Sequence, residues 1–186
     1  MRPTPPLVRP AAESDFEALC RLDLTYPTGR FLSLERSGEP VEQTFVFRWR
    51  NREAGTAVYA HPTGEWLHNA LSRADLFLVA EVDGRVGGYL IIAVPSWTDA
   101  AEITDLAVDR ALRRRGAGRA LIGAADQWAR GRDLRSLWVE PRADNYEAIQ
   151  FYLSLGFRLA GFNDRLYSNR DHEEGRPTLY MHFELS

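Results

Sequence analysis

The stretch LAVDRALRRRGAG, residues 106–118, joins an apolar strand-like segment to the start of a helix. Gly116 and Gly118 carry no Cβ, so the backbone there can bend and approach a ligand closely. The N–H groups at a helix start point at such a ligand, and the helix dipole favours an anion. The pattern therefore predicts a cradle for a phosphorylated cofactor. The alternative is a solvated arginine cluster beside a glycine turn, because short glycine patterns are unspecific.

Composition restricts the class of protein. A length of 186 residues with 45% apolar residues predicts one domain, residues 1–186. A net charge of −3 argues against a nucleic-acid binder. The chain has no run of about 18 apolar residues, so we expect a cytoplasmic protein without a membrane partner. Cys20 is the only cysteine and is expected to be buried in a helix. Four scattered histidines show no metal-binding spacing, so no metal is expected.

The first half of the chain gives strong signals at its two ends and weak ones between. Val8 begins a short strand, and Ser14 is expected to cap a helix that ends near residues 25–29. Residues 31–60 are harder to read, and the pattern favours a hairpin of 44–49 with 56–59. A short helix is predicted over 65–73. Two antiparallel strands, 76–82 and 86–94, then flank a turn at Asp83-Gly84.

The second half reads as β-α-β-α-β-β. A strand over 101–109 leads through the glycine turn to a helix with a small-residue face. Asp144 and Glu147 form a capping-box pattern that starts the second helix, and Gly156 is placed to end it. The remaining strands are expected at 134–140, 157–162 and 179–185.

The glycine turn lacks the spacing of a dinucleotide-binding fold and the Lys-Ser/Thr ending of a P-loop. It resembles instead the acetyl-CoA-binding motif Gln/Arg-x-x-Gly-x-Gly/Ala of the GNAT acetyltransferase superfamily, which here is Arg113 to Gly118. A second motif similar to that family follows in the expected order. It reads Asn145-x-x-Ala148-x-x-Phe151-Tyr152-x-x-x-Gly156-Phe157.

This resemblance implies an α/β fold with a single curved mixed sheet flanked by helices. A V-shaped splay is expected between the fourth and fifth core strands, and residues 31–75 are expected to form a variable acceptor-side region. The implied co-substrate is acetyl-CoA, with a homodimer through the last strand as a further expectation. The cofactor-binding residues that the resemblance implies are Leu106, Ala107, Val108, Arg113, Arg114, Arg115, Gly116, Ala117, Gly118, Arg119, Asn145 and Tyr152.

Acetyl transfer to an amine requires a base. An amine with a pKa of about 10.4 is neutral in only about one of 2,500 molecules at pH 7, so its deprotonation requires roughly 4.6 kcal/mol. Glu102 is the first candidate, since many family members carry a catalytic glutamate at this place. Asp105 is the second, on the opposite face of a regular strand, although a β-bulge would change that. The alternative is that both carboxylates only lie near the ends of the strand and neither acts as the base.

Tyr152 matches the tyrosine that in many relatives donates a proton to the sulfur of coenzyme A. Its ordinary pKa near 10 keeps it protonated at neutral pH. The alternative reading is a core aromatic on the apolar face of its helix. Asn145 has a similar alternative, as a helix-start residue that satisfies its own turn. The sequence shows no arrangement that supports a covalent intermediate, so direct attack is expected.

The acceptor is less well defined. Segments around Trp97 and Gly156 look similar to streptothricin-type antibiotic acetyltransferases, which favours a small cationic acceptor. Acetylation of a protein lysine or N-terminus is the main alternative, and a non-catalytic acyl-CoA sensor is the alternative from another class. Several carboxylates and aromatic residues are candidates for acceptor contacts: Asp99, Asp105, Glu140, Asp164, Tyr26, Phe31, Trp49, Tyr59, Trp66 and Trp97.

Overall fold

The computed structural model describes residues 5–59, 62–171, 173–174 and 176–185. Residue 60, which closes the range that the sequence left hard to read, lies outside them. The chain divides into two units: residues 1–25, 58–138 and 183–186 form the first, and residues 26–57 and 139–182 form the second. None of the helices described is long and apolar enough to cross a membrane.

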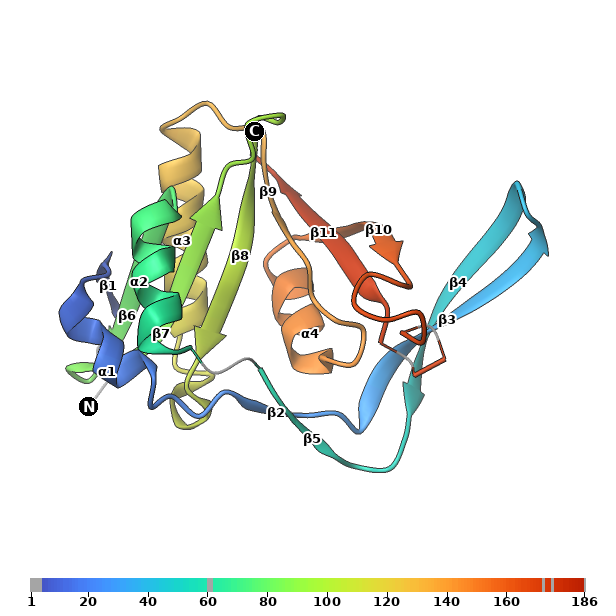
Figure 1. Ribbon diagram of the computed structural model, residues 1–186, viewed down its shortest axis with the longest axis horizontal. Helices are drawn as coiled ribbons and strands as arrows, with labels where there is room; N and C mark the ends of the chain where they lie inside the picture. Colours follow the sequence, from blue (N-terminus) through green and yellow to red (C-terminus); the bar gives the residue numbers. More distant parts are fainter. Residues whose placement is uncertain (1–4, 60–61, 172, 175, 186) are drawn as a thin grey trace. The chain divides into compact units, whose positions relative to one another are not determined.

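The elements follow one another as Figure 1 shows. The helices are α1 (Phe16–Leu19), α2 (Gly64–Arg73), α3 (Ala117–Arg130) and α4 (Tyr146–Ser154), with 3-10 turns at Glu13–Asp15 and Arg110–Leu112. The strands are β1 (Leu7–Pro10), β2 (Thr25–Pro27), β3 (Arg30–Glu39), β4 (Glu42–Asn51), β5 (Thr56–Val58), β6 (Leu76–Val82), β7 (Arg85–Ala93), β8 (Ala100–Val108), β9 (Ser136–Val139), β10 (Arg158–Asn163) and β11 (Thr178–Glu184). The predicted β-α-β-α-β-β order of the second half, β8 to β11, is confirmed.

The first unit is built on four antiparallel strands in the order β1-β6-β7-β8. The β6–β7 hairpin turns at Asp83 and Gly84, whose φ angles are 52° and 74°. Two consecutive positive φ angles match the right-handed twist of the flanking strands, which is why an Asp-Gly pair predicts this turn. The hairpin expected from the sequence is therefore confirmed.

The two faces of this sheet carry different helices (Figure 1). Alternate residues of β6 and β7 point to the same face. Phe77, Val79, Tyr89 and Ile91 form one core with Leu19 of α1 and Leu67 of α2. Helix α3 packs against β6, β7 and β8, and its Leu121, Ala125 and Ala129 are fully buried. Its small residues allow close approach to the strands, as the sequence indicated.

The first helix is shorter than predicted. Ser14 does not cap it: the segment begins at Ala12, whose N–H donates to the Asp15 carboxylate at 2.9 Å, and Arg9 binds the same carboxylate at 2.7 Å. The helix ends at Leu19, so Cys20 follows the last turn and is exposed. The prediction of a buried helical cysteine is therefore wrong. The core contact at Leu22 is made by irregular chain.

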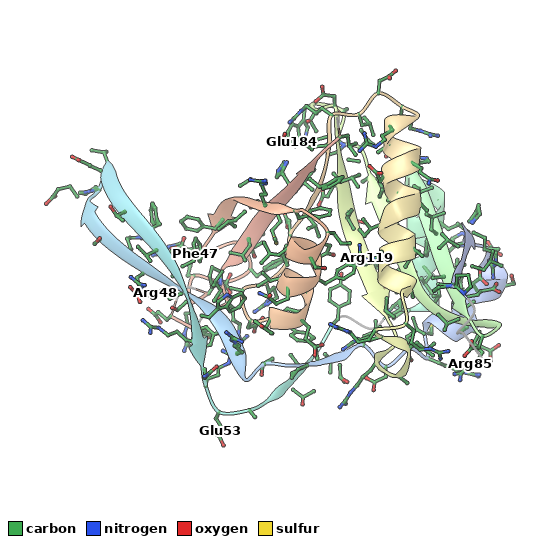
Figure 2. All side chains as sticks on the ribbon, turned by 180° about the vertical axis from the view of Figure 1, so that it is seen from behind. Phe47, Arg48, Glu53, Arg85, Arg119 and Glu184 are labelled. Atoms are coloured by element: carbon green, nitrogen blue, oxygen red, sulfur yellow. The ribbon has the colours of Figure 1, made fainter. Side chains whose placement is uncertain are left out.

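In the second unit, β3 and β4, of ten residues each, form a hairpin around Pro40 and Val41. The predicted pairing of 44–49 with 56–59 is wrong, because 44–49 pairs with 32–37 and β5 pairs with β2. Neighbouring residues Phe47 and Arg48 point to opposite faces of β4 (Figure 2). Phe47 packs edge-on against Phe162 with ring centroids 5.2 Å apart, whereas Arg48 pairs with Glu35.

Helix α4 begins at Asn145, whose side chain accepts from the Ala148 N–H at 3.1 Å. The prediction that Asp144 forms the cap is therefore wrong. The helix stops at Gly156, which adopts a φ of 95°, as predicted. Its Tyr152 packs against Phe151 and Phe157, with ring centroids 5.3 and 5.2 Å away.

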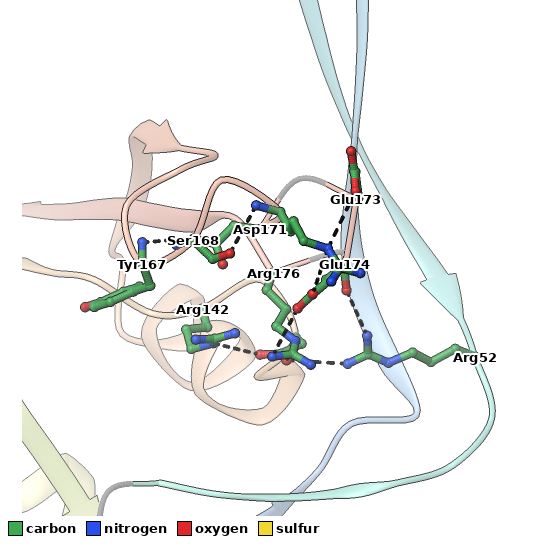
Figure 3. A network of polar contacts seen from close by, with 10 residues as sticks. Arg52, Arg142, Tyr167, Ser168, Asp171, Glu173, Glu174 and Arg176 are labelled. Atoms are coloured by element: carbon green, nitrogen blue, oxygen red, sulfur yellow. Dashed lines mark hydrogen bonds and ion pairs between the residues drawn. The ribbon is translucent and has the colours of Figure 1, made fainter.

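Asp144 instead is buried and forms ion pairs with three arginines. Figure 3 labels these arginines, Arg52, Arg142 and Arg176. Arg52 and Arg142 approach its carboxylate to 3.5 Å, and Arg176 approaches to 3.8 Å. Arg176 also pairs with Glu174 at 3.4 Å. The three arginines come from the end of β4, from the chain before α4 and from the segment before β11. One buried carboxylate therefore connects three segments of the second unit.

Asp144→Asn is expected to destabilise the protein by about 3 kcal/mol, because removing one charge of a buried ion cluster leaves its partners uncompensated. The matched control is Glu35→Gln. Glu35 also binds two arginines, Arg48 and Arg50, but its side chain is 46% exposed against 6% for Asp144. That change is expected to alter stability by less than about 1 kcal/mol. Chemical unfolding measures both, and equal effects would contradict the assignment of Asp144 as the connecting residue.

Candidate functional site

The predicted anion cradle lies at the start of α3, which is the longest helix described. Gly116 is its cap residue with a φ of 92°, and Arg114 has a φ of 61°. The Gly116 carbonyl accepts the first helical bond, from the Ala120 N–H at 2.9 Å. A glycine cap has no side chain to accept from the first-turn N–H groups, so these groups remain aimed at the space before the helix. The residues present therefore fit a pyrophosphate.

The arginines of the cradle differ in what they contact. Arg113 donates through Nε to the Val108 carbonyl at 3.1 Å, and Arg115 forms an ion pair with Asp83 in the β6–β7 turn. Arg114 and Arg119 are exposed. Figure 2 shows Arg119 projecting from α3. Arg113 and Arg115 thus brace the loop, and anion binding by the backbone N–H groups stays a prediction.

The β8 residues predicted to contact the cofactor alternate between faces. Ala107 is buried in the core beneath α1 and α2, while Leu106 and Val108 are half-buried. Leu106 pairs with Leu90, and Val108 pairs with Gly88. The Val108 carbonyl accepts from Arg113, so Arg113 already satisfies part of the main chain that the resemblance assigns to the pantetheine arm. That assignment stays a prediction.

A β-bulge in β8 changes the arrangement of the two candidate bases. Ile91 pairs with Asp105, whereas the next residue, Ile92, pairs with Ile103, so Thr104 is an extra residue. Ala93 pairs with Glu102. Because Ile91 and Ala93 point to one face, and paired residues share a face, Glu102 and Asp105 lie on the same face. The opposite-face expectation for a regular strand is wrong, and the bulged alternative is the one observed.

Asp105 is held by a tyrosine from a distant part of the same unit. The Tyr59 hydroxyl donates to Asp105 Oδ1 at 2.7 Å. Burial raises the pKa of Asp105 to about 6, while the hydrogen bonds from Tyr59 and Thr104 lower it. The carboxyl therefore ionises close to neutral pH, where a general base is most effective. The pKa of the neighbouring Tyr89 is raised by burial and by the charge of Asp105, so Tyr89 stays protonated.

A pocket of about 340 Å³ opens beside Asp105 between α2, β7 and β8. Among the described residues that line it, Asp105 is the one carboxylate and Arg73 the one cation. Trp66 stands at one end of the lining and is 37% exposed. The pocket is lined by Trp66, Asn69, Ala70, Arg73, Ala74, Ile91, Ile92, Ala93, Thr104 and Asp105.

The second unit carries the other two predicted residues. Asn145 uses its side-chain oxygen to cap α4, as in the alternative reading of its role, which leaves its amide N–H groups as donors. Tyr152 is 5% exposed in an aromatic cluster, so the core reading of this residue also applies. Neither observation tests a role toward the cofactor.

Other predicted acceptor contacts have local partners. Asp99 pairs with Arg135 at 2.6 Å, and Asp164 forms an ion pair with Arg36. Burial raises the pKa of Glu140. Trp97 is 80% exposed and lies outside the core. Within the described ranges, His, Cys, Asp and Glu form no group of three or more that could hold a metal ion.

The sequence did not reveal the contact between Tyr59 and Asp105. The sequence indicates Tyr59 as one of the acceptor-side aromatic residues, and its pattern predicts that Tyr59 lies in a hairpin strand. It follows β5 in an extended segment, and its N–H donates to the Leu24 carbonyl at 3.2 Å. The signal that could have found it is the isolated Val-Tyr pair before the Pro-Thr start of α2.

Comparison with known proteins shows which proteins this chain is similar to. The sequence pattern described as the acetyltransferase (GNAT) family matches residues 43–157. A streptothricin acetyltransferase from Streptomyces lavendulae is 28% identical over 180 residues, covering 93% of this chain and 92% of that one. The [ribosomal protein bS18]-alanine N-acetyltransferase of Escherichia coli K12 is 35% identical over 92 residues, which is 50% of this chain and 61% of that one.

Solved structures show the same fold. A crystal structure of nourseothricin acetyltransferase superposes with a TM-score of 0.81 at 27% identity, covering 98% of this chain and all of that one. A putative streptothricin acetyltransferase from Bacillus anthracis, solved with acetyl coenzyme A, gives a TM-score of 0.80 at 20% identity, with coverage of 96% and 99%. The predicted α/β fold of the GNAT type is therefore confirmed.

Tyr59→Phe is expected to raise the pKa of Asp105 above about 6, because the variant loses one of the two hydrogen bonds that lower this pKa while burial still raises it. At pH 6 the carboxyl would change from half-ionised to mostly protonated. Carbon-detected NMR titration of the aspartate carboxyls measures this directly. Tyr167→Phe, at an exposed tyrosine, is the control and should leave the titration unchanged. An unchanged Asp105 titration in Tyr59→Phe would show that the hydrogen bond does not tune this carboxyl.

Proposed function

Because the chain belongs to the acetyltransferase (GNAT) family, we propose that it transfers the acetyl group of acetyl-CoA to a primary amine of a small cationic acceptor. The observation that carries this proposal is the Asp105 carboxylate, held by Tyr59 at the bulge beside a pocket. A carboxyl that ionises near neutral pH suits the removal of a proton from an ammonium group. The similarity to a streptothricin acetyltransferase over most of the chain supports a small acceptor.

The cradle at the start of α3 is proposed to bind the pyrophosphate of acetyl-CoA. Gly116, Ala117 and Gly118 present the backbone there, and the exposed Arg114 and Arg119 supply positive charge. Arg113 and Arg115 act through the loop conformation that they brace. Leu106 and Val108 are proposed to pair with the pantetheine amides by main-chain hydrogen bonds, and Asn145 is proposed as a further contact. The thioester supplies an acetyl group activated for attack by nitrogen.

Asp105 is proposed as the general base in preference to Glu102. Both lie on one face of the bulged strand; Asp105 lines the pocket and accepts the hydrogen bond from Tyr59, and its pKa is raised to about 6. Its carboxylate takes the proton of the ammonium, so that the neutral nitrogen attacks the thioester carbonyl carbon. The C–N bond forms and the C–S bond breaks, and Tyr152 is proposed to give its proton to the departing sulfur. The nitrogen then releases its second proton, which restores the Tyr152 phenol and leaves a neutral amide.

The similarity to a ribosomal-protein alanine acetyltransferase supports a second candidate function, the acetylation of a protein N-terminus or lysine. That similarity covers half of this chain, whereas the streptothricin acetyltransferase covers nearly all of it, so the small acceptor is preferred. A non-catalytic acyl-CoA sensor is disfavoured by Asp105 and Tyr59, which a sensor would not need. The single domain, the homodimer and the cytoplasmic location stay predictions.

Gly118→Trp is expected to weaken acetyl-CoA binding by at least about tenfold, because a large side chain would occupy the space in front of the helix amides. The matched control is Gly123→Trp on the same helix, where an added side chain meets open space. Calorimetry with acetyl-CoA compares the two variants. If both bind as the unaltered protein does, or if the unaltered protein does not bind, the cradle assignment is wrong.

Tyr152→Phe is expected to lower kcat by about 10² to 10⁴ if the hydroxyl donates a proton to the leaving sulfur. The ring contacts with Phe151 and Phe157 do not need the hydroxyl, so the fold should survive. Thiol release measures turnover, and the KM for acetyl-CoA reports whether the site remains intact. Full turnover in Tyr152→Phe would leave Tyr152 as a core residue only.

A further inference from the structure

The pocket between α2, β7 and β8 combines one internal charge with apolar walls. Five of its ten lining residues are alanine or isoleucine. Asp105 supplies the negative charge and is half-buried, with Tyr59 and Thr104 as its hydrogen-bond partners. The cavity of about 340 Å³ falls within the range of small-molecule sites, roughly 300 to 1,000 Å³.

The position of Asp105 along this pocket follows from the strand register. Trp66, at one end, packs edge-on toward Tyr89 with centroids 6.3 Å apart. At the other end, the residue after Ala74 donates to the Ile92 carbonyl at 2.9 Å. Asp105 pairs with Ile91, between Tyr89 and Ile92 on β7. Its carboxylate therefore lies along the length of α2 rather than at either end.

The charged groups around the pocket limit its ligand. Arg73 is exposed in the last turn of α2, so its cation lies at the rim. Tyr59 and Tyr89 face Asp105 as protonated hydroxyl groups, and Glu102 shares its face of the sheet. An ammonium group beside Asp105 would be paired and could contact the Trp66 ring. A second cation near Arg73 would be repelled.

We propose that this pocket is the subsite for the acceptor, and that it takes a primary ammonium on an unbranched aliphatic arm. Asp105 binds the ammonium, and Ala70, Ala74, Ile91 and Ala93 line the arm. The body of the acceptor beyond the arm lies toward Arg73 and is uncharged or carries oxygen acceptors there. This inference rests on the proposed acetyl transfer and specifies the class of amine that the same site accepts.

The test introduces charge at Asn69, which lines the pocket and is exposed. Asn69→Lys is expected to raise the KM for n-pentylamine by about tenfold, and Asn69→Glu to lower it by a few-fold, through charge interaction with the ammonium. His68→Lys and His68→Glu are the matched controls. His68 precedes Asn69 on α2, lies outside the pocket lining and pairs with Glu13 at 3.3 Å. These variants should leave the KM unchanged.

Binding provides a readout that does not depend on turnover. Calorimetry measures the affinity of n-pentylamine for each variant in complex with coenzyme A, and these affinities should rank the variants in the same order as the KM values. The affinities for the neutral analogue n-pentanol should not follow that order. The KM for acetyl-CoA should stay constant throughout.

The possible outcomes distinguish failure of the proposed acetyl transfer from failure of the pocket assignment. A protein that binds no acetyl-CoA and acetylates no amine would overturn the proposed function. If acetyl transfer occurs but both Asn69 variants behave as their His68 controls do, the acceptor lies elsewhere and the pocket assignment is wrong. A preference for diamines over n-pentylamine in the unaltered protein would overturn the class of acceptor.

Discussion

The hydrogen bond from the Tyr59 hydroxyl to Asp105, 2.7 Å long, is the interaction on which the proposed chemistry depends. Without it, a carboxylate so far out of water would be still harder to ionise, because burial is the main cause of its raised pKa. With it, the pKa of Asp105 is about 6, so the ionised carboxylate predominates at neutral pH. The same carboxylate can then first attract an ammonium group and afterwards accept its proton.

Two features of the chain bring Tyr59 and Asp105 together. The bulge at Thr104 shifts the register of β8, so that Asp105 joins Glu102 on the face covered by α1 and α2. The segment after β5 brings Tyr59 back to that face, where it packs beside the core of Leu24 and Leu67. The bulge leaves the Leu106 to Val108 end of the strand in regular pairing with β7. One strand thus carries the proposed base in its second half and leads, beyond its C-terminal end, into the proposed cradle.

The fold was more predictable than the site, for physical reasons. Asp83-Gly84 and Gly116 require positive φ angles, and such requirements can be read from sequence. The small residues of α3 and the alternation of β11 likewise follow from local periodicity. The long-range partners could not be read in this way. Asp144 has the pattern of a local cap but pairs with three arginines, of which Arg52 and Arg176 are distant in sequence, and Asn145 caps the helix instead. The bulge at Thr104 brings Asp105 to the face that carries Glu102, and residues 102–105 show no local pattern that requires a bulge.

The central claim is that Asp105, rather than Glu102, is the base. The measurement that tests it most directly is the pH dependence of kcat/KM for the amine acceptor between about pH 5 and pH 8, in the unaltered protein, Asp105→Asn and Glu102→Gln. The account predicts that activity rises with pH through an apparent pKa near 6 in the unaltered protein and in Glu102→Gln. Asp105→Asn should lose this limb together with most of its activity. A limb retained in Asp105→Asn and lost in Glu102→Gln would contradict the account.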